Sequence, residues 1–405
     1  MKEVAIIAPN SFPVPPIRGG GIQTAITETT PFYKEYKPYI FSNCEYGIDK
    51  LPLKETVGNI EHRRICQSPW DEFKIKITHL TIHNYFPYVF EIIRQIKEIK
   101  PGVIHLMNRP WFLPILRKYL GSEIKIILHH FNNYLMEMPK KKAGGYLALI
   151  DGFIGCSKFT VDHEVSSRFP EYNSISYIVG NGVDIGKFNR DKLNANTLSA
   201  LRNKYGLKID DVAIMYVGRL VEDKGALQLL KAFKKVLSIA QKKQLKLLIV
   251  GSSFYGGETK TTPFIEELHK ASESIKENIV FTGFVDRNNI QNTFGVGDIV
   301  VIPSIVQDAS PIVAYEASAM KIPVVGTKRG GIPELVKDGE TGLIVNDPYD
   351  IDDLAEKILY LVERPDKRKS FGENGRAFME KNYDWKIIAG KMEEVYNKVL
   401  KGRQR

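Results

Sequence analysis

The tract that decides the fold runs from residue 212 to residue 225 and reads VAIMYVGRLVEDKG. Its first six residues, Val212–Val217, form a short apolar and β-branched run, which predicts a buried strand. A polar turn follows, and apolar residues then recur at helical spacing over Lys224–Ala240. A strand that leads directly into a helix predicts one βαβ unit of a parallel sheet.

The same alternation of strand and helix extends to both sides of this tract. Further strands are expected at Leu245–Val250, Ile279–Phe281, Ile299–Ile302, Val4–Ala8, Val103–Leu106 and Ile124–Leu128, with a helix at Tyr88–Lys100. Such alternation requires crossover connections, so we expect an α/β protein with two Rossmann-like, doubly wound parallel sheets. A length of 405 residues also suits two domains, which we place at residues 1–188 and 189–383.

The lack of long apolar segments and the net charge limit the kinds of protein and of binding partner to be expected. No segment approaches the roughly 18 uninterrupted apolar residues of a membrane span, so we expect a cytoplasmic protein. The chain has 57 basic and 47 acidic residues, a net charge of +10 that is spread along its length. This mild excess favours anionic small molecules or an acidic membrane surface, is also common in ordinary enzymes, and gives no reason to expect a nucleic-acid partner.

Cysteine and histidine spacing gives no metal site. Cys44, Cys66 and Cys156 lie far apart without a C-x-x-C pair, which argues against a disulfide framework and against a zinc knuckle. We therefore expect three buried thiols. The histidines show no paired ligand spacing, so neither a metal nor another cofactor is expected.

The turn after Val217 has the chemistry of an anion site. Gly218 allows a ligand to approach the backbone, Arg219 and Lys224 supply two cations, and the helix start offers unpaired N–H groups. A diphosphate needs that combination. A solvated basic loop is the alternative interpretation.

A second candidate segment, residues 303–317, follows the strand Ile299–Ile302. Ser310 and Pro311 read as the N-cap and first residue of a helix, so the amides of Ile312 and Val313 would meet a second anion. Asp308 and Glu316 place two carboxylates at the same strand end, where they suit sugar hydroxyls. In the alternative, Asp308 caps a loop and Glu316 forms a surface salt bridge.

Several motifs occur together in one order along the C-terminal half. They are Arg219 with Lys224, FTGF at 281–284, Asp308 with Glu316, IPVVG at 322–326 and RGGIPELVKDGETG at 329–342, preceded by NGVD at 181–184. This order resembles the retaining, nucleotide-sugar-dependent glycosyltransferases of the GT-B fold, specifically family four. The segments RGGGIQ at 18–23 and NRP at 108–110 are similar to the bacterial branch that builds cell-surface and spore-coat polysaccharides.

The resemblance implies roles for individual residues of the donor site. Arg219 and Lys224 would hold the donor diphosphate, and Glu316 would accept from the ribose hydroxyls. The backbone at Phe284 and Val285 would border the base. Asp308 would contact the transferred sugar; because the family usually has Glu there, the departure leaves the identity of the sugar open.

In the N-terminal half, the resemblance points to a glycine turn and a histidine. Gly19, Gly20 and Gly21 begin a helix after the first strand, which suits approach to the donor phosphate. His129 and His130 end the strand Ile124–Leu128, and alternation lets only one of them face a cleft. His130 fits the position of the family's active-site histidine without a gap, and a gap would place Phe131 there instead.

The resemblance implies an enzyme with two domains facing across a cleft, which moves a sugar from a nucleoside diphosphate donor to a carbohydrate or lipid-linked acceptor with retention. The acceptor would bind the first domain, on which the last helix, within residues 384–405, would pack. Basic residues there, Lys140–Lys142 among them, suit peripheral contact with the inner face of a membrane, or are simply solvated. The alternatives are a catalytically weak carbohydrate-binding or coat-assembly protein and a GT-B sugar-nucleotide epimerase.

Overall fold

The computed structural model of the protein describes residues 1–17, 20–44, 51–66, 86–240, 244–253 and 261–402. The chain divides into two compact units, which are described separately. Unit 1 comprises Met1–Asn181 and Trp385–Arg405, and unit 2 comprises Gly182–Asp384. The boundary lies a few residues before the one expected at residue 188. No helix among the described residues has the length and apolar character needed to cross a bilayer.

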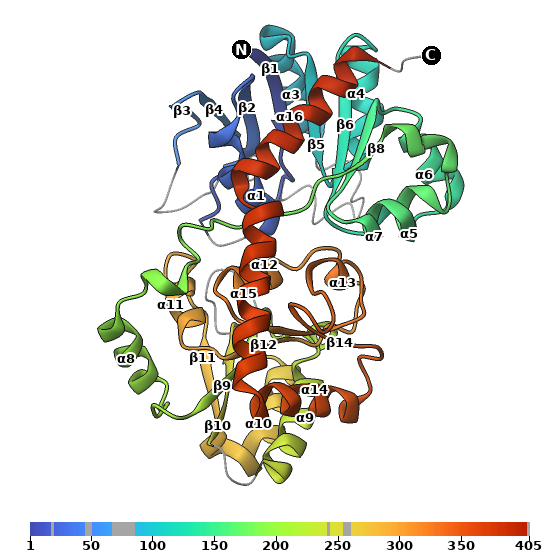
Figure 1. Ribbon diagram of the computed structural model, residues 1–405. Helices are drawn as coiled ribbons and strands as arrows, with labels where there is room; N and C mark the ends of the chain where they lie inside the picture. The colour runs from blue at the N-terminus through green and yellow to red at the C-terminus, as the bar shows by residue number, and fades with distance from the viewer. Residues whose placement is uncertain (18–19, 45–50, 67–85, 241–243, 254–260, 403–405) are drawn as a thin grey trace. The chain divides into compact units, whose positions relative to one another are not determined.

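In the described part of unit 1, eight strands form one sheet in the order β3-β4-β2-β1-β5-β6-β7-β8 (Figure 1). They are β1 (Lys2–Ile7), β2 (Tyr36–Asn43), β3 (Lys54–Val57), β4 (Ile60–Ile65), β5 (Val103–Met107), β6 (Lys125–His130), β7 (Gly152–Gly155) and β8 (Ser176–Ile178). All neighbours pair in parallel except β3, which runs antiparallel to β4. The expectation of a fully parallel sheet is wrong at this edge, because only two residues join β3 to β4, enough for a hairpin and too few for a crossover.

The helices of unit 1 lie between these strands in the chain, except for α16, which follows unit 2. They are α1 (Gly21–Thr29), η1 (Thr30–Phe32), α3 (Phe86–Ile99), η2 (Pro110–Phe112), α4 (Leu113–Leu120), α5 (Tyr134–Glu137), α6 (Lys140–Leu147), α7 (Lys158–Val161), the π-helical η3 (Asp162–Ser166), η4 (Pro170–Ile175) and α16 (Trp385–Lys401). The amphipathic α3 buries Ile92, Ile93 and Ile96 in one core with Ile104 and Leu106 of β5. The predicted helix at Tyr88–Lys100 therefore packs as its apolar stripe requires.

Unit 2 is built on a sheet whose described strands are all parallel, in the order β11-β10-β9-β12-β13-β14. They are β9 (Val212–Val217), β10 (Leu245–Val250), β11 (Ile279–Gly283), β12 (Ile299–Ile302), β13 (Val324–Thr327) and β14 (Gly342–Val345). Ala213 and Met215 of β9 pack in one core, and Ile214 and Tyr216 pack in another. Both faces of this sheet are buried, as expected of a doubly wound fold, and the α/β class is confirmed.

The helices of unit 2 alternate with its strands. They are η5 (Arg190–Lys192), α8 (Ala195–Lys204), η6 (Glu222–Lys224), α9 (Ala226–Ile239), α10 (Pro263–Ser272), η7 (Glu273–Asn278), α11 (Ile290–Gly295), α12 (Ile312–Ala319), α13 (Ile332–Leu335), α14 (Ile351–Glu363) and α15 (Pro365–Asn382). Each strand from β9 to β13 is followed by at least one helix before the next strand. This order produces the crossovers that a parallel sheet needs.

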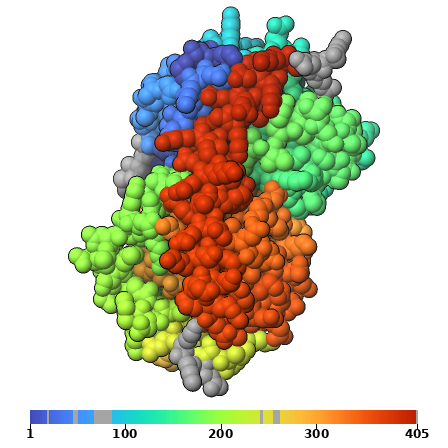
Figure 2. Space-filling view, in the orientation of Figure 1, coloured from blue at the N-terminus to red at the C-terminus, as the bar shows by residue number. Residues whose placement is uncertain are grey.

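Helix α16 packs on unit 1, although it follows unit 2 in the chain. Its buried carboxylate, Glu393 Oε1, accepts from the backbone N–H groups of Lys34 and Glu35, each at 2.8 Å. The hydroxyl of Tyr396 lies 3.0 Å from that of Tyr33. The helix contacts α1, and its outer face, red in Figure 2, is exposed beside the blue N-terminal residues of the same unit. Residues 385–401 are therefore part of the core of unit 1.

The expectation of three buried thiols is wrong for two cysteines. Cys44 and Cys66 form a disulfide with a Cα–Cα separation of 4.9 Å, and only Cys156 is a free, buried thiol. The cause is strand pairing. Cys44 directly follows β2 and Cys66 directly follows β4, and the final residues of these neighbouring parallel strands, Asn43 and Ile65, are in register. Sequence spacing alone does not reveal such a pairing.

Candidate active site

The strand order of unit 2 places a topological switch point between β9 and β12. β9 pairs with β10 on one side and with β12 on the other, so the sheet grows in opposite directions from these two strands. In open parallel sheets, ligands bind in the crevice outside the carboxyl ends of two such strands. The residues that follow Val217 and Ile302 are therefore the first candidates for a site.

Lys224 is positioned by the turn that follows β9. It ends the short helix η6, and Gly225 adopts a left-handed conformation, with φ of 73°, before α9 begins. A Cβ on Gly225 would lie 1.9 Å from the carbonyl oxygen of Pro303, so only glycine lets this turn pack against the end of β12. Lys224 therefore precedes α9, which corrects the helix predicted at Lys224–Ala240.

Lys224 and Asp308 form an ion pair across this switch point. Lys224 Nζ donates to Asp308 Oδ2 over 2.6 Å, and the two side chains are only 25% and 16% exposed. Ser304 Oγ lies 3.4 Å from the same oxygen, and the backbone carbonyl of Asp308 accepts from Gly331 N at 2.8 Å. The cation expected to meet a phosphate and the carboxylate expected to meet a sugar thus neutralise each other.

The backbone that carries Gly218 and Arg219 is fixed at the same edge of the sheet. Gly218 N donates to Val250 O at 3.0 Å, and the hydroxyl of Tyr216 donates to the carbonyl of Arg219 at 2.6 Å. Gly251 approaches so closely that a Cβ there would lie 1.9 Å from Gly218 O. Arg219 itself is partly exposed. This turn therefore presents two cations from a backbone that has little room to move.

Glu316 lies in the second turn of α12 and is almost completely buried. Its Oε1 accepts from Arg287 Nη1 at 2.8 Å, and the Glu316 side chain is 5% exposed. A surface salt bridge is therefore the wrong description of this carboxylate. Arg287 follows β11, close to the predicted base-binding pair, of which Phe284 is exposed and Val285 is packed against the core.

The predicted cap of α12 differs from the observed one. The helix begins at Ile312, its N-cap is Pro311, and no side chain caps it. The hydroxyl of Ser310 instead lies 2.7 Å from that of Tyr315. The prediction of Ser310 as N-cap and Pro311 as first helical residue is therefore wrong by one residue, whereas Ile312 and Val313 do open the helix, where backbone N–H groups lack helical partners.

The glycine turn of unit 1 leads into α1 as predicted. Gly20 precedes the helix with φ of 133°, a conformation that side chains rarely adopt, and Gly21 is its first residue. Arg18 and Gly19 lie outside the described residues. The turn follows β1, so it belongs to the carboxyl edge of the sheet in unit 1.

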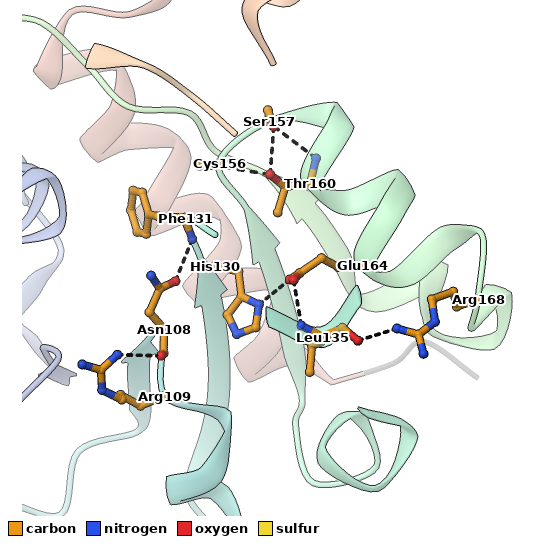
Figure 3. Close-up of polar contacts among 10 residues, drawn as sticks. All are labelled: Asn108, Arg109, His130, Phe131, Leu135, Cys156, Ser157, Thr160, Glu164 and Arg168. Atoms are coloured by element: carbon orange, nitrogen blue, oxygen red, sulfur yellow. Dashed lines mark hydrogen bonds and ion pairs between the residues drawn. The ribbon is translucent and has the colours of Figure 1, made fainter. Parts of the chain in front are cut away.

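His130 is fully buried and lies against a buried carboxylate (Figure 3). Its Nδ1 contacts Glu164 Oε2, and Glu164 Oε1 accepts from Leu135 N at 2.8 Å. Glu164 comes from the π-helical segment η3, and among the described residues the His130 Nε2 atom has no hydrogen-bond partner. In this conformation the ring offers no surface to a ligand, and the pair fixes the start of α5 after β6.

His129 points to the opposite face and joins a chain of buried polar groups. Its Nδ1 lies 3.0 Å from His105 Nε2, and His105 Nδ1 lies 2.7 Å from the hydroxyl of Tyr396 on α16. Burial lowers the pKa of His105 to about 3, and burial together with the neighbouring His105 and His130 holds the pKa of His129 well below its usual range. Both rings are therefore neutral at pH 7. Phe131, the alternative candidate, stacks on His129 with ring centroids 4.2 Å apart.

The structure thus gathers Gly218, Arg219, Lys224 and Asp308 at one switch point, and it adds partners that the sequence did not reveal. Arg287 pairs with Glu316 and Glu164 pairs with His130, and each pair joins residues about thirty positions apart. Glu164 has no motif around it. Arg287 could have been found from its position, because the tract Gly283–Arg287 directly follows a predicted strand.

Comparisons with known proteins identify the family of unit 2. Residues 199–378 match the family described as "Glycosyl transferases group 1". The "Spore coat protein SA" of Bacillus subtilis (strain 168) is 24% identical over 98% of this chain and 99% of its own length. A glycosyltransferase from Rickettsia africae ESF-5 superposes with a TM-score of 0.77 at 20% identity, covering 99% of each chain. Anabaena Alr3699/HepE in complex with UDP and glucose superposes with a TM-score of 0.73 at 18% identity, covering 98% of this chain and all of that one.

Proposed function

We propose that this chain, a GT-B glycosyltransferase whose residues 199–378 form a group 1 domain, moves a sugar from a nucleoside diphosphate donor to a hydroxyl acceptor with retention of anomeric configuration. The observation that carries the proposal is the Lys224–Asp308 pair at the switch point of that domain. The Anabaena protein of the same fold has been solved with UDP and glucose, which supports a donor of this class.

The donor diphosphate takes the place of Asp308 beside Lys224. A phosphate oxygen offers the ammonium group a second acceptor with more negative charge, and Arg219 adds a further cation from the same turn. Asp308 is then released to accept from hydroxyls of the transferred sugar. Glu316, with one oxygen held by Arg287, accepts from the ribose through the other, and Phe284 and Val285 border the base.

The chemical step is a displacement on one face of the sugar. The bond from the anomeric carbon to the diphosphate oxygen breaks, and its electron pair stays on the diphosphate. The acceptor oxygen forms the new bond on the same face, and its proton passes to an oxygen of the departing phosphate. Arg219 and Lys224 stabilise the charge that grows on the leaving group, worth about 10²–10³ in rate for each such donor in known sites. His130 of unit 1 stays a proposed catalytic residue, and its contact in this conformation is with Glu164.

Donor turnover in the absence of acceptor tests the proposal. The full chain is incubated with UDP-, GDP- and ADP-sugars, and release of the free nucleoside diphosphate is measured with and without EDTA. We expect slow hydrolysis of one donor, unaffected by EDTA because Arg219 and Lys224 supply the positive charge that a divalent cation would otherwise bring to the diphosphate. Lys224→Ala should abolish hydrolysis, whereas Lys235→Ala, which removes an exposed lysine paired with Asp352 in the same unit, should not.

Two results would contradict this function. A chain that binds donors but releases no nucleoside diphosphate is a carbohydrate-binding or assembly protein. A chain that converts the donor into a different sugar nucleotide is an epimerase.

We also infer a cytoplasmic reaction in the synthesis of cell-surface or spore polysaccharide, with a carbohydrate or lipid-linked acceptor held by unit 1. The relation to a spore coat protein supports the context. Lys140, Lys141 and Lys142 are exposed in the first turns of α6 and suit peripheral contact with acidic lipid at the inner face of the membrane.

A further inference from the structure

Unit 1 has a switch point of its own, between β1 and β5. β1 pairs with β2 on one side and with β5 on the other, and sheets of this topology bind ligands in the crevice outside the carboxyl ends of two such strands. Asn10 follows β1, and Asn108 and Arg109 follow β5. Arg109 Nε donates to Asn10 Oδ1 at 3.0 Å, so this arginine spans the switch point.

The side chain of Arg109 is held in place by neutral groups. Its Nη1 donates to the carbonyl of Asn108 at 3.1 Å, and its guanidinium carbon lies 5.2 Å from the centre of the Trp111 ring. Asn108 turns the chain here with a positive φ of 51°, and its Oδ1 accepts from Phe131 N at 2.7 Å. Figure 3 shows the guanidinium extending away from the His130–Glu164 pair.

Arg109 has no carboxylate within ion-pair distance among the described residues, in contrast to Arg64 and Arg117 of the same unit. Arg64 pairs with Glu55, and Arg117 pairs with Asp151. Partial burial lowers the pKa of Arg109, with the hydroxyls of Tyr134 and Tyr88 acting in the opposite direction. An arginine stays charged at neutral pH, so a partly buried positive charge remains here without a counter-ion from the part of the chain that the structure describes.

We propose that Arg109 binds an anionic group, a carboxylate or a phosphate, on the acceptor. The planar guanidinium suits either group, because both accept two parallel hydrogen bonds from it. Trp111 and Tyr134, whose ring centroids are 5.7 Å apart, supply apolar surface beside the charge. This inference rests on the proposed function only in assigning the anionic group to the acceptor. The anion site itself is a property of unit 1.

Binding of matched probes to the full chain tests the site without requiring turnover. The probes are methyl glucuronide for a carboxylate, glucose 6-phosphate for a phosphate, methyl glucoside as the neutral counterpart, and UDP, each titrated by calorimetry. We expect one charged sugar to bind roughly tenfold or more tightly than the glucoside, since hydrogen bonds to charged groups have that effect on affinity. Which charged sugar binds better identifies the source of the anion.

Three variants make the result decisive. Arg109→Gln should remove the preference for the charged sugar and leave UDP affinity unchanged. Arg109→Lys should retain part of the preference, which controls for loss of folding in the glutamine variant. Arg94→Gln, an exposed arginine paired with Glu91 and Glu98 on α3, should behave like the wild type.

Other outcomes overturn the proposal. Equal binding of charged and neutral sugars by the wild type removes the anion site. If the preference for the charged sugar survives in Arg109→Gln, another cation binds the anionic group. If that variant binds UDP more weakly, Arg109 belongs to the donor site instead. UDP affinity of Lys224→Ala, measured in parallel, reports on the proposed donor site, so the two ideas fail separately.

Discussion

At the switch point of unit 2, Lys224 donates to the carboxylate of Asp308, whereas at the switch point of unit 1, Arg109 donates to the neutral amide of Asn10. Each sheet thus has a cation at its switch point, Lys224 after β9 and Arg109 after β5, but the two cations differ in their partners. A paired cation must exchange its partner when an anion binds, and the carboxylate becomes available to hydroxyls. A cation with neutral partners binds an anion without such an exchange, so the two sites suit a sugar diphosphate and a charged acceptor respectively.

The largest expected effect comes from removing the cations of unit 2. Replacing Arg219 and Lys224 together by Ala should lower kcat/KM for the donor by about three to five orders of magnitude, because both stabilise the leaving diphosphate. Steady-state kinetics measures the effect, and thermal unfolding serves as the control for folding. Activity within about tenfold of the wild type would remove both residues from the site.

A lower pH should decrease the stability of unit 1, which contains His105 and His129. His105 and His129, with lowered pKa values in the fold, stay neutral while the unfolded chain takes up protons below about pH 6.5. The stability they confer is complete above that pH and falls by up to roughly 1.4 kcal/mol per pH unit for each histidine, down to about pH 3 for His105.

The fluorescence of tryptophan measures this effect, because Trp111 and Trp385 belong to unit 1 and the sequence of unit 2, residues 182–384, contains no tryptophan. Urea unfolding at pH 7.5 and pH 5.0 should show a lower midpoint at pH 5.0. His105→Asn should reduce the difference between the two midpoints. Identical midpoints for the wild type would show that the two rings are not held neutral by burial.

A smaller effect is expected at the nucleotide end of the donor site. Glu316→Ala should weaken binding of the donor about ten- to hundredfold, because the ribose loses a charged acceptor. Calorimetric titration measures the affinity, and Glu273→Ala, which breaks an exposed pair with Lys276 in the same unit, is the matched control. An unchanged titration by folded Glu316→Ala would place the ribose elsewhere.

The smallest effect concerns the surface of unit 1. Changing Lys140, Lys141 and Lys142 to Ser should reduce sedimentation with acidic liposomes by about tenfold or less, since successive helical residues point in different directions and cannot all reach one surface. Neutral liposomes provide the control. Equal and negligible sedimentation of both proteins with acidic lipid would argue for an acceptor in solution.

Local sequence predicted the strands better than it predicted their partners. Val212–Val217 and Leu245–Val250 have the predicted bounds, because a buried parallel strand needs a continuous apolar run and little else. The glycine turn before α1 and the cations after β9 were also evident, since their chemistry lies within a few residues.

What the sequence did not reveal depends on contacts between distant residues. The disulfide of Cys44 and Cys66 requires the register of β2 with β4, and the Asn10–Arg109 contact requires β1 to lie beside β5. Ser310 was misassigned because Tyr315, one turn further along, provides a partner for its hydroxyl. A sequence pattern describes the residues of one segment. Each of these features is a contact between residues of different segments or turns, which such a pattern does not predict.

The placement of α16 has a consequence for the order of synthesis. Unit 1 supplies the first 181 residues of the chain but lacks its core helix until residues 385–401 have been made, after the whole of unit 2. During translation the backbone N–H groups of Lys34 and Glu35 lack their acceptor until Glu393 has been made. His105 likewise lacks its hydroxyl partner until Tyr396 has been made. The unit that leaves the ribosome first is thus the last to be completed, and until then the apolar surface that α16 covers stays exposed to aggregation.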